Sequence, residues 1–133
     1  MSDAYSPQVL DHFARPRNLG RLPDADGRGA AGDRRDGTVW IEVAIRVAGE
    51  VVADARFRAL GCSAAIAASS MATTLIAGRP VAAAGALTAD EITAALGGLP
   101  AARLYAPALA AEAVRAAVAD YARRGTAGEG RTA

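Results

Sequence analysis

Apolar and polar residues alternate in two neighbouring runs, residues 38–47 and 51–60, and each alternation predicts a strand with one buried face. The short connection at residues 48–50 joins the two runs into a predicted β-hairpin. Trp40 is expected on the outer face of the first strand, whose expected core positions are Val39, Ile41, Val43, Ile45 and Val47. The expected core positions of the second strand are Val51, Ala53, Ala55, Phe57 and Ala59.

Helical periodicity replaces this alternation on both sides of the hairpin. Ser6 and Pro7 are typical of a helix N-cap and first helical position, and Pro16 ends that helix. Its apolar face is expected to consist of Val9, Leu10 and Phe13. The small-residue run 64–77 predicts a central helix that Gly78 stops.

The other segments predict a loop, two further helices and a tail. Residues 19–37 are rich in Gly, Asp and Arg and predict a loop, and residues 88–96 predict a short capped helix. A last helix is expected from Pro107, with core positions Leu109, Ala113, Ala116 or Ala117, and Tyr121. Residues 125–133 are polar and contain glycine, so we expect a disordered tail after a single domain spanning residues 1–124.

Taken in order, these elements indicate an α+β fold, a small antiparallel sheet with helices packed mainly on one face. A length of 133 residues suits one domain, and a net charge of +1 gives no indication of nucleic acid or a membrane surface as partner. All 15 basic residues are arginine, which excludes Schiff-base and P-loop lysines. With one cysteine, no visible signal peptide and no apolar run long enough for a membrane span, the expected location is cytoplasmic.

That single cysteine, Cys62, lies where the second strand run ends and the central helix begins. The free N–H groups and dipole of a helix N-terminus favour a thiolate, so we expect Cys62 to be partly accessible and more acidic than a free thiol. A buried core cysteine is the alternative reading of the same position. The one histidine, His12, is expected to be a partly exposed surface residue.

The junction Gly61-Cys62-Ser63, after Asp54-Ala55-Arg56-Phe57, resembles the U-type scaffold proteins of iron–sulfur cluster assembly, namely IscU, SufU and the N-terminal domain of NifU. Residues 5–13 with Arg15-Pro16-Arg17-Asn18-Leu19-Gly20 are similar to the opening of that family, and residues 109–121 to its closing helix. The resemblance spans residues 5–123, nearly the whole chain, and implies the α+β fold of this family.

The resemblance also implies a site. Ala31-Gly32-Asp33 aligns with the Cys-Gly-Asp ligand loop of the family, and Ala106 takes the position of its third cysteine. The implied ligands are therefore Cys62 and Asp33, for iron or an iron–sulfur cluster, with zinc as an alternative metal. Since Ala31 and Ala106 have no donor atom, we expect no stable cluster on a monomer, whereas a homodimer would pool two thiolates and two carboxylates.

The implied partners are a cysteine desulfurase and apo-target proteins. Leu99-Pro100-Ala101-Ala102-Arg103 aligns with the segment that docks a chaperone in the IscU branch, although an ordinary loop is the simpler reading. Arg34 and Arg35 would add positive charge near Cys62 if their loop folds over it.

Three functions remain open at this stage. The first is a scaffold or carrier that takes iron or sulfur through Cys62, and the second is a binding or regulatory paralogue that docks a desulfurase or target without holding a cluster. The third is an enzyme with Cys62 as nucleophile, which needs a base, and His12 is the one histidine available.

Overall fold

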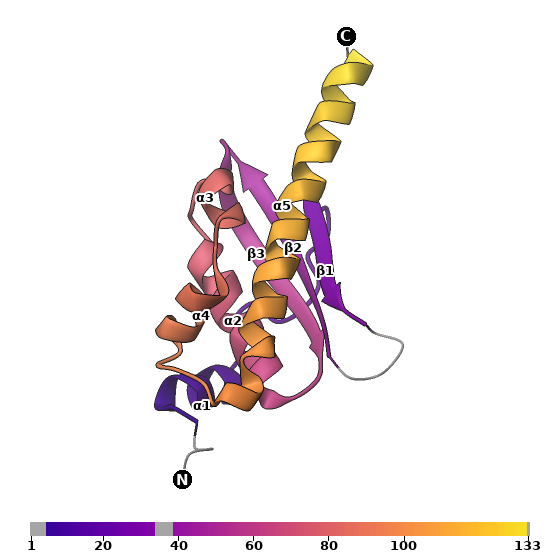
Figure 1. Ribbon diagram of the computed structural model, residues 1–133. Helices are drawn as coiled ribbons and strands as arrows, with labels where there is room; N and C mark the ends of the chain where they lie inside the picture. Colours follow the sequence, from indigo (N-terminus) through magenta and orange to yellow (C-terminus); the bar gives the residue numbers. More distant parts are fainter. Residues whose placement is uncertain (1–4, 34–38, 133) are drawn as a thin grey trace.

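The computed structural model describes residues 5–33 and 39–132, with side chains described as far as residue 125. An α+β fold is confirmed (Figure 1). The elements, in chain order, are α1 (Pro7–Ala14), β1 (Gly27–Gly32), β2 (Trp40–Ala48), β3 (Val51–Leu60), α2 (Ser63–Ile76), α3 (Val81–Gly85), α4 (Ala89–Ala95), the 3-10 turn η1 (Ala101–Arg103) and α5 (Tyr105–Thr132).

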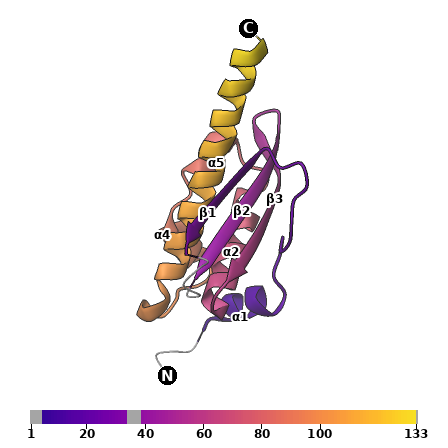
Figure 2. The ribbon, with the colours of Figure 1, turned by 90° about the vertical axis from the view of Figure 1, so that its right-hand side faces the viewer.

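The three strands form one antiparallel sheet in the order β1-β2-β3. Helices α2 and α5 pack on one of its faces, which confirms the predicted layering (Figures 1 and 2). The segment between α1 and β1 runs along the other side of the sheet (Figure 2). There Leu22 and Ala25 bury themselves against Ala44, so the open face carries a small apolar patch of its own.

Strand β2 follows the predicted alternation. Ile41, Val43 and Ile45 are fully buried on the helix side, while the Trp40 ring lies on the other face with the guanidinium of Arg58 5.7 Å from its centre. The alternation succeeds here because one face of β2 packs on helices and the other is partly open to solvent.

Strand β3 departs from the predicted alternation in its first half. Phe57 and Ala55 are buried as expected, but Val52 is buried in place of Val51, and Ala53 is exposed. The cause is a β-bulge: Arg46 pairs with Asp54 and Val47 with Val52, which leaves Ala53 without a partner on β2. An extra residue in one strand reverses the side of every residue beyond it.

Strand β1 lies within residues 19–37, for which the sequence predicted a loop, and that prediction is wrong for residues 27–32. A Cβ added at Gly27 would come 2.4 Å from the carbonyl oxygen of Ala117, and one at Gly29 would come 2.2 Å from the Ala117 nitrogen. The two glycines therefore let α5 approach the strand backbone more closely than any other residue would allow.

Helix α1 has the predicted N-cap, since the Ser6 hydroxyl accepts a hydrogen bond from the Val9 N–H at 3.1 Å. Its expected apolar face is only partly correct, because Val9 is buried but Leu10 and Phe13 are 53% and 43% exposed. The prediction of a surface histidine is wrong as well. His12 is 8% exposed, because α1 packs on α2 through the side that carries it.

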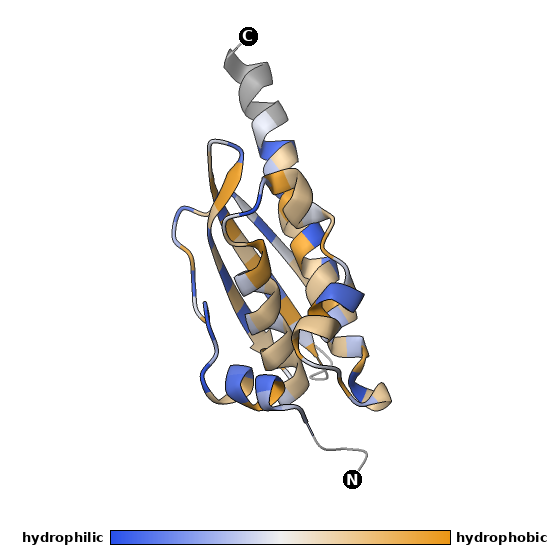
Figure 3. Ribbon diagram, turned by 90° about the vertical axis from the view of Figure 1, so that its left-hand side faces the viewer, coloured by the Kyte–Doolittle hydropathy of each residue, from blue (hydrophilic) through white to orange (hydrophobic). Residues whose placement is uncertain are grey.

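Helix α2 is the buried centre of the domain. Ten of its residues are buried, among them Ala64, Ala68 and Ala72, and Figure 3 shows mainly hydrophobic colours along it. Alanine at so many positions lets the helix pack closely against the sheet, α1 and α5. Its first turn is thereby fixed at the end of β3.

The remaining helices agree with the predictions in part. Thr88 caps α4 through a reciprocal capping box with Glu91. Helix α5 begins at Tyr105, two residues before the expected start, and continues to Thr132 through the segment expected to be a disordered tail. Gly125 lies within this helix without a positive φ, so it does not form the left-handed cap that would end a helix.

Candidate functional site

Cys62 stands at the N-cap of α2, one residue after Gly61 turns the chain out of β3. Gly61 has φ +145°, a conformation that side chains disfavour, and a Cβ there would lie 3.3 Å from Val39 Cγ2. This turn leaves the Cys62 side chain half-buried, with its sulfur near the first turn of the helix. The predicted partial accessibility is confirmed.

Three side chains from distant segments gather around the thiol. The Tyr105 hydroxyl, from the start of α5, lies 2.8 Å from Cys62 Sγ in hydrogen-bond contact. Arg103, from η1, acts on both groups through its positive charge and donates from Nε to the Tyr5 hydroxyl at 3.2 Å. Tyr5 and Arg103, together with Pro100 and Ala102, line a shallow hollow of about 440 Å³.

These neighbours make the thiol acidic. Burial raises the pKa of Cys62, but the hydrogen bond from Tyr105, the N–H groups of Ala65 and Ala64 and the charge of Arg103 together lower that pKa below its ordinary value. The same contact raises the pKa of Tyr105, so Cys62 ionises first and the phenol donates to the thiolate. The predicted acidity of Cys62 is confirmed.

Asp33, the second predicted ligand, lies at the same end of the sheet. It follows β1 directly, is exposed, and its N–H donates to the Val39 carbonyl at 3.1 Å. Gly32 pairs with Trp40, and Trp40 pairs with Leu60. The register therefore brings the last residues of β1 and β3 to the same end of the sheet. The assignment of Asp33 as a ligand stays a prediction.

The other predicted positions contribute no donor atom. Ala31 is 6% exposed and faces the core, and Ala106 is fully buried in α5. Within residues 5–33 and 39–132, no group of three or more His, Cys, Asp and Glu side chains comes together to hold a metal ion. Arg34 and Arg35 lie outside the described residues.

The pairing of Cys62 with His12, which the enzyme hypothesis required, is absent among the described residues. His12 Nδ1 is hydrogen-bonded to Ser70 Oγ at 2.7 Å. Ser70 follows Cys62 by eight residues, about 12 Å along the axis of α2. The thiol therefore has a phenol, not an imidazole, as its nearest polar partner.

Sequence reasoning missed Tyr105 and Arg103, which lower the pKa of the thiol, and Tyr5, which accepts a hydrogen bond from Arg103. The Cys62–Tyr105 contact joins residues 43 positions apart and the Arg103–Tyr5 contact joins residues 98 apart. No local pattern encodes such contacts. The one indication of their role in the sequence was the alignment with the resembled family, in which Arg103 and Tyr105 fall in segments that match functional segments.

Comparisons with known proteins agree with this fold. Residues 4–127 match the family described as NifU-like N terminal domain. Iron-sulfur cluster assembly scaffold protein IscU 1 of Archaeoglobus fulgidus is 42% identical over 120 residues, which cover 90% of this chain and 78% of that protein. Nitrogen fixation protein NifU of Cereibacter sphaeroides is 45% identical over 125 residues, covering 94% of this chain and 48% of that one.

Solved structures share the fold. A putative iron-sulfur cluster assembly scaffold protein for the SUF system from Fervidobacterium islandicum gives a TM-score of 0.56 at 17% identity, covering 84% of this chain and 81% of that one. A nitrogen-fixing NifU-like protein (N-terminal) from Brucella abortus gives 0.54 at 20% identity, covering 92% and 83%. Among the described residues, no helix has the length and apolar character needed to cross a membrane.

Proposed function

This chain belongs to the NifU-like N-terminal domain family, and on that premise we propose that it acts in iron–sulfur cluster assembly as a scaffold-type protein. It would bind iron or sulfur as cargo at a site centred on Cys62, without turning over a substrate. The observation that carries the proposal is the half-exposed, acidic thiol of Cys62 at the N-terminus of α2, in contact with Tyr105.

The thiolate is the form that such a role requires. It is both the soft ligand that iron prefers and the nucleophile that accepts sulfur from a donor. Tyr105 and Arg103 favour this form by lowering the pKa of Cys62, and a reducing compartment such as the cytoplasm keeps the single thiol free.

The donor set fits one iron ion better than a complete cluster on one chain. Cys62 supplies a thiolate and Asp33 a carboxylate, while the buried side chains at Ala31 and Ala106 supply nothing. Four protein ligands are usual for a [2Fe–2S] cluster. We therefore propose either a single bound ion, with zinc as an alternative to iron, or a cluster bridged between two copies of the chain.

A sulfur donor would reach the thiol over an apolar rim. Leu60, two residues before Cys62, is 47% exposed, and Tyr105, which contacts the sulfur, is 38% exposed. Leu104, which precedes Tyr105 in the chain, is 45% exposed. Exposed apolar side chains around a reactive group are typical of a docking surface. The proposed partners here are a cysteine desulfurase and the apo-proteins that receive the cargo. Because Arg103 of the Leu99–Arg103 segment is engaged with Tyr5 and the thiol, we assign that segment to the site in preference to chaperone docking.

Anaerobic reconstitution with iron and sulfide, followed by size separation and metal analysis of each peak, tests the proposal. We expect less than a full cluster in the monomer peak, and any cluster in the dimer peak to disappear in Cys62→Ala. Tyr121→Phe, which alters a phenol outside this site, serves as the control variant.

Two irons and two sulfides per monomer, retained on desalting without added thiol, would contradict the ligand assignment. Iron in neither peak would favour the alternative, a paralogue that docks a desulfurase or target without holding a cluster. A pull-down with desulfurase, compared between the native chain and a Leu104→Asp variant, would then test docking by itself.

A further inference from the structure

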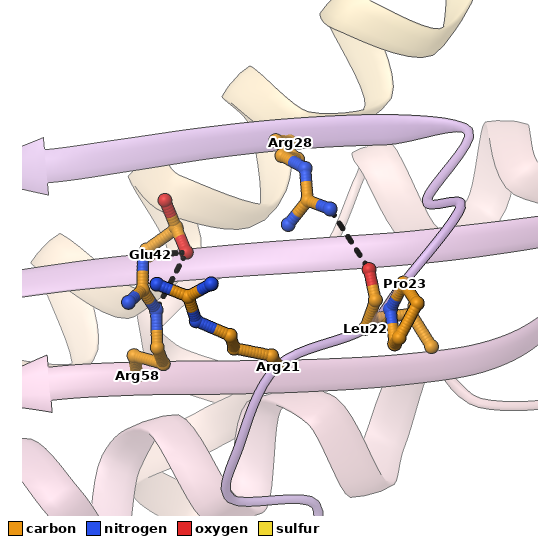
Figure 4. A pocket seen from close by; sticks show the side chains of 6 residues that line it. All are labelled: Arg21, Leu22, Pro23, Arg28, Glu42 and Arg58. Carbon is orange, nitrogen blue, oxygen red and sulfur yellow. Dashed lines mark hydrogen bonds and ion pairs between the residues drawn. The ribbon is translucent and has the colours of Figure 1, made fainter.

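The open face of the sheet carries a group of arginines that the Cys62 site does not use. Arg21, Arg28 and Arg58 line a hollow of about 370 Å³ together with Leu22, Pro23 and Glu42 (Figure 4). The three guanidinium groups come from three separate segments, namely the stretch before β1, β1 itself and β3. A hollow of this volume has the size of a small-molecule site.

Positive charge in this hollow exceeds negative charge. Glu42 offsets Arg58, with which it forms an ion pair at 3.0 Å. Arg21 and Arg28 form no ion pair within the described part of the chain. At the margin Arg46 adds a further guanidinium that has a carbonyl, and no carboxylate, as its partner. The lining itself thus holds one carboxylate and three guanidinium groups.

Backbone carbonyls hold two of these side chains in place. Arg28 donates to the carbonyl of Leu22 at 2.8 Å, and Arg46 donates to that of Pro23 at 2.8 Å. Since a guanidinium has five N–H donors, each keeps others for a ligand. Leu22 is itself anchored by burial against Ala44, so the segment that orients the arginines is fixed to the sheet.

We propose that this hollow binds a small polyanion, a molecule that carries at least two phosphate or carboxylate groups. Planar guanidinium groups match both kinds of anion through paired hydrogen bonds. Like charges held close together repel, and a bound anion is the partner that relieves the repulsion. Recognition is by charge and not by stacking, because the neighbouring ring, Trp40, lies against Arg58 and outside the hollow lining.

The binding site is independent of the proposed function. Cys62 follows the end of β3 and contacts Tyr105 of α5, whereas the hollow lies over the face of the sheet that the helices leave free (Figure 4). Loss of the thiol therefore leaves the hollow intact, and the two proposals fail or succeed separately.

Titration calorimetry of the intact chain at low ionic strength, with inorganic tripolyphosphate and separately with citrate, tests the proposal. We expect Arg21→Gln to weaken binding about tenfold, the usual loss for one charge-assisted contact. Arg21 makes no hydrogen bond or ion pair with a described residue, so its replacement spares the fold, which a melting curve verifies. Arg115→Gln on α5 is the matched control, since that exposed arginine is also unpaired in the described residues, and its affinity should stay unchanged.

A second variant tests the charge balance in the opposite direction. Glu42→Gln removes the single carboxylate of the lining and should strengthen binding several-fold. Tripolyphosphate binding without citrate binding supports a phosphate ligand, and the reverse supports a carboxylate ligand. Failure of both anions to bind, or equal weakening by Arg21→Gln and Arg115→Gln, would overturn the proposal, because equal weakening indicates general attraction to a basic surface.

Discussion

Cys62, the N-cap residue of helix α2, and Ser70, in the middle of that helix, are used by the domain in opposite ways. Cys62, at its first turn, stays half-exposed and meets Tyr105 from α5. Ser70, in its middle, is fully buried and meets His12 from α1. One end of the helix is thus open to reagents, and the middle is closed. The difference follows from what packs on each position, because α1 covers Ser70 whereas the N-terminal end of α2 stays partly uncovered.

The buried contact between Ser70 of α2 and His12 of α1 is part of a structural joint, a hydrogen-bonded network that connects the two helices. Ser70 Oγ bonds His12 Nδ1 at 2.7 Å and accepts from the Arg17 N–H at 2.9 Å, and Asn18 donates to Thr73 at 3.2 Å. No buried side-chain nitrogen or oxygen among the described residues lacks a partner. A buried network with every partner present ties α1 and the turn after it to α2.

The largest effect is expected from breaking this joint. His12→Leu leaves the Ser70 hydroxyl short of a partner, and we expect it to lower the free energy of unfolding by about 2 kcal/mol. Urea denaturation measures the change. Leu10→Ala, at an exposed neighbour on the same helix, should cost less than about 1 kcal/mol. Equal stability of His12→Leu and the native chain would show that the joint is dispensable.

Acid should loosen the same joint. Burial, aided by the charge of Arg17, lowers the pKa of His12, although Asp11 opposes the shift. His12 therefore binds a proton at a higher pH in the unfolded chain than in the folded chain. The free energy of unfolding should fall as the pH drops through about 6.5, the pKa of an unfolded histidine. Below the pKa of His12 in the folded chain, this contribution to the loss ends. Urea midpoints at a series of pH values measure this loss, and His12→Gln should remove it. The same slope in both proteins would assign it to other groups.

At the N-terminal end of α2, breaking the contact between Tyr105 and Cys62 should change the reactivity of the thiol. Tyr105→Phe removes the hydrogen bond that stabilises the Cys62 thiolate, and we expect alkylation at neutral pH to slow roughly threefold. Tyr121→Phe is the control, because that phenol bonds Glu50 at 3.0 Å, apart from the thiol site. Alkylation rates across pH measure the change. An unchanged pH profile in Tyr105→Phe would leave the helix N-terminus as the main cause of the acidity.

The smallest effect is expected on the free energy of unfolding when Cys62, at the N-terminal end of α2, is replaced. Cys62 occupies the N-cap of α2 in extended conformation without a capping hydrogen bond from its side chain. Serine is a strong N-cap residue, so Cys62→Ser should raise the free energy of unfolding by up to about 1 kcal/mol, while Cys62→Ala leaves it nearly unchanged. Urea denaturation of the two variants measures both. Loss of stability in Cys62→Ser would mean that the thiol contributes to packing.

Prediction from the sequence succeeded where a residue's surroundings are local. Ser6 and Thr88 cap their helices as expected, the alternation in β2 predicted its faces, and the strand-to-helix junction predicted the partial exposure of Cys62. Each of these depends on neighbours within a few positions along the chain. The family resemblance supplied the architecture, which the fold and the comparisons confirm.

Prediction failed where a distant segment decides. His12 was taken for a surface residue, because nothing in α1 reveals that Ser70 will cover it. The bulge at Ala53 and the partnership of Tyr105 with Cys62 likewise depend on other strands and helices. Asp33 as a ligand remains a prediction, since its carboxylate would act only with cargo or a second chain present.

The contact of Gly27 and Gly29 with α5 also bears on how the chain folds. Strand β1 has no alternating apolar pattern to fix its register on β2. Its register is fixed by exclusion, because a slip of one residue would turn the Arg28 or Ala30 side chain into space that the Ala117 backbone fills. The final pairing of β1 therefore depends on contacts with a helix some ninety positions later in the chain. Since non-local contacts of this kind slow folding, we expect β1 and α5 to pair late.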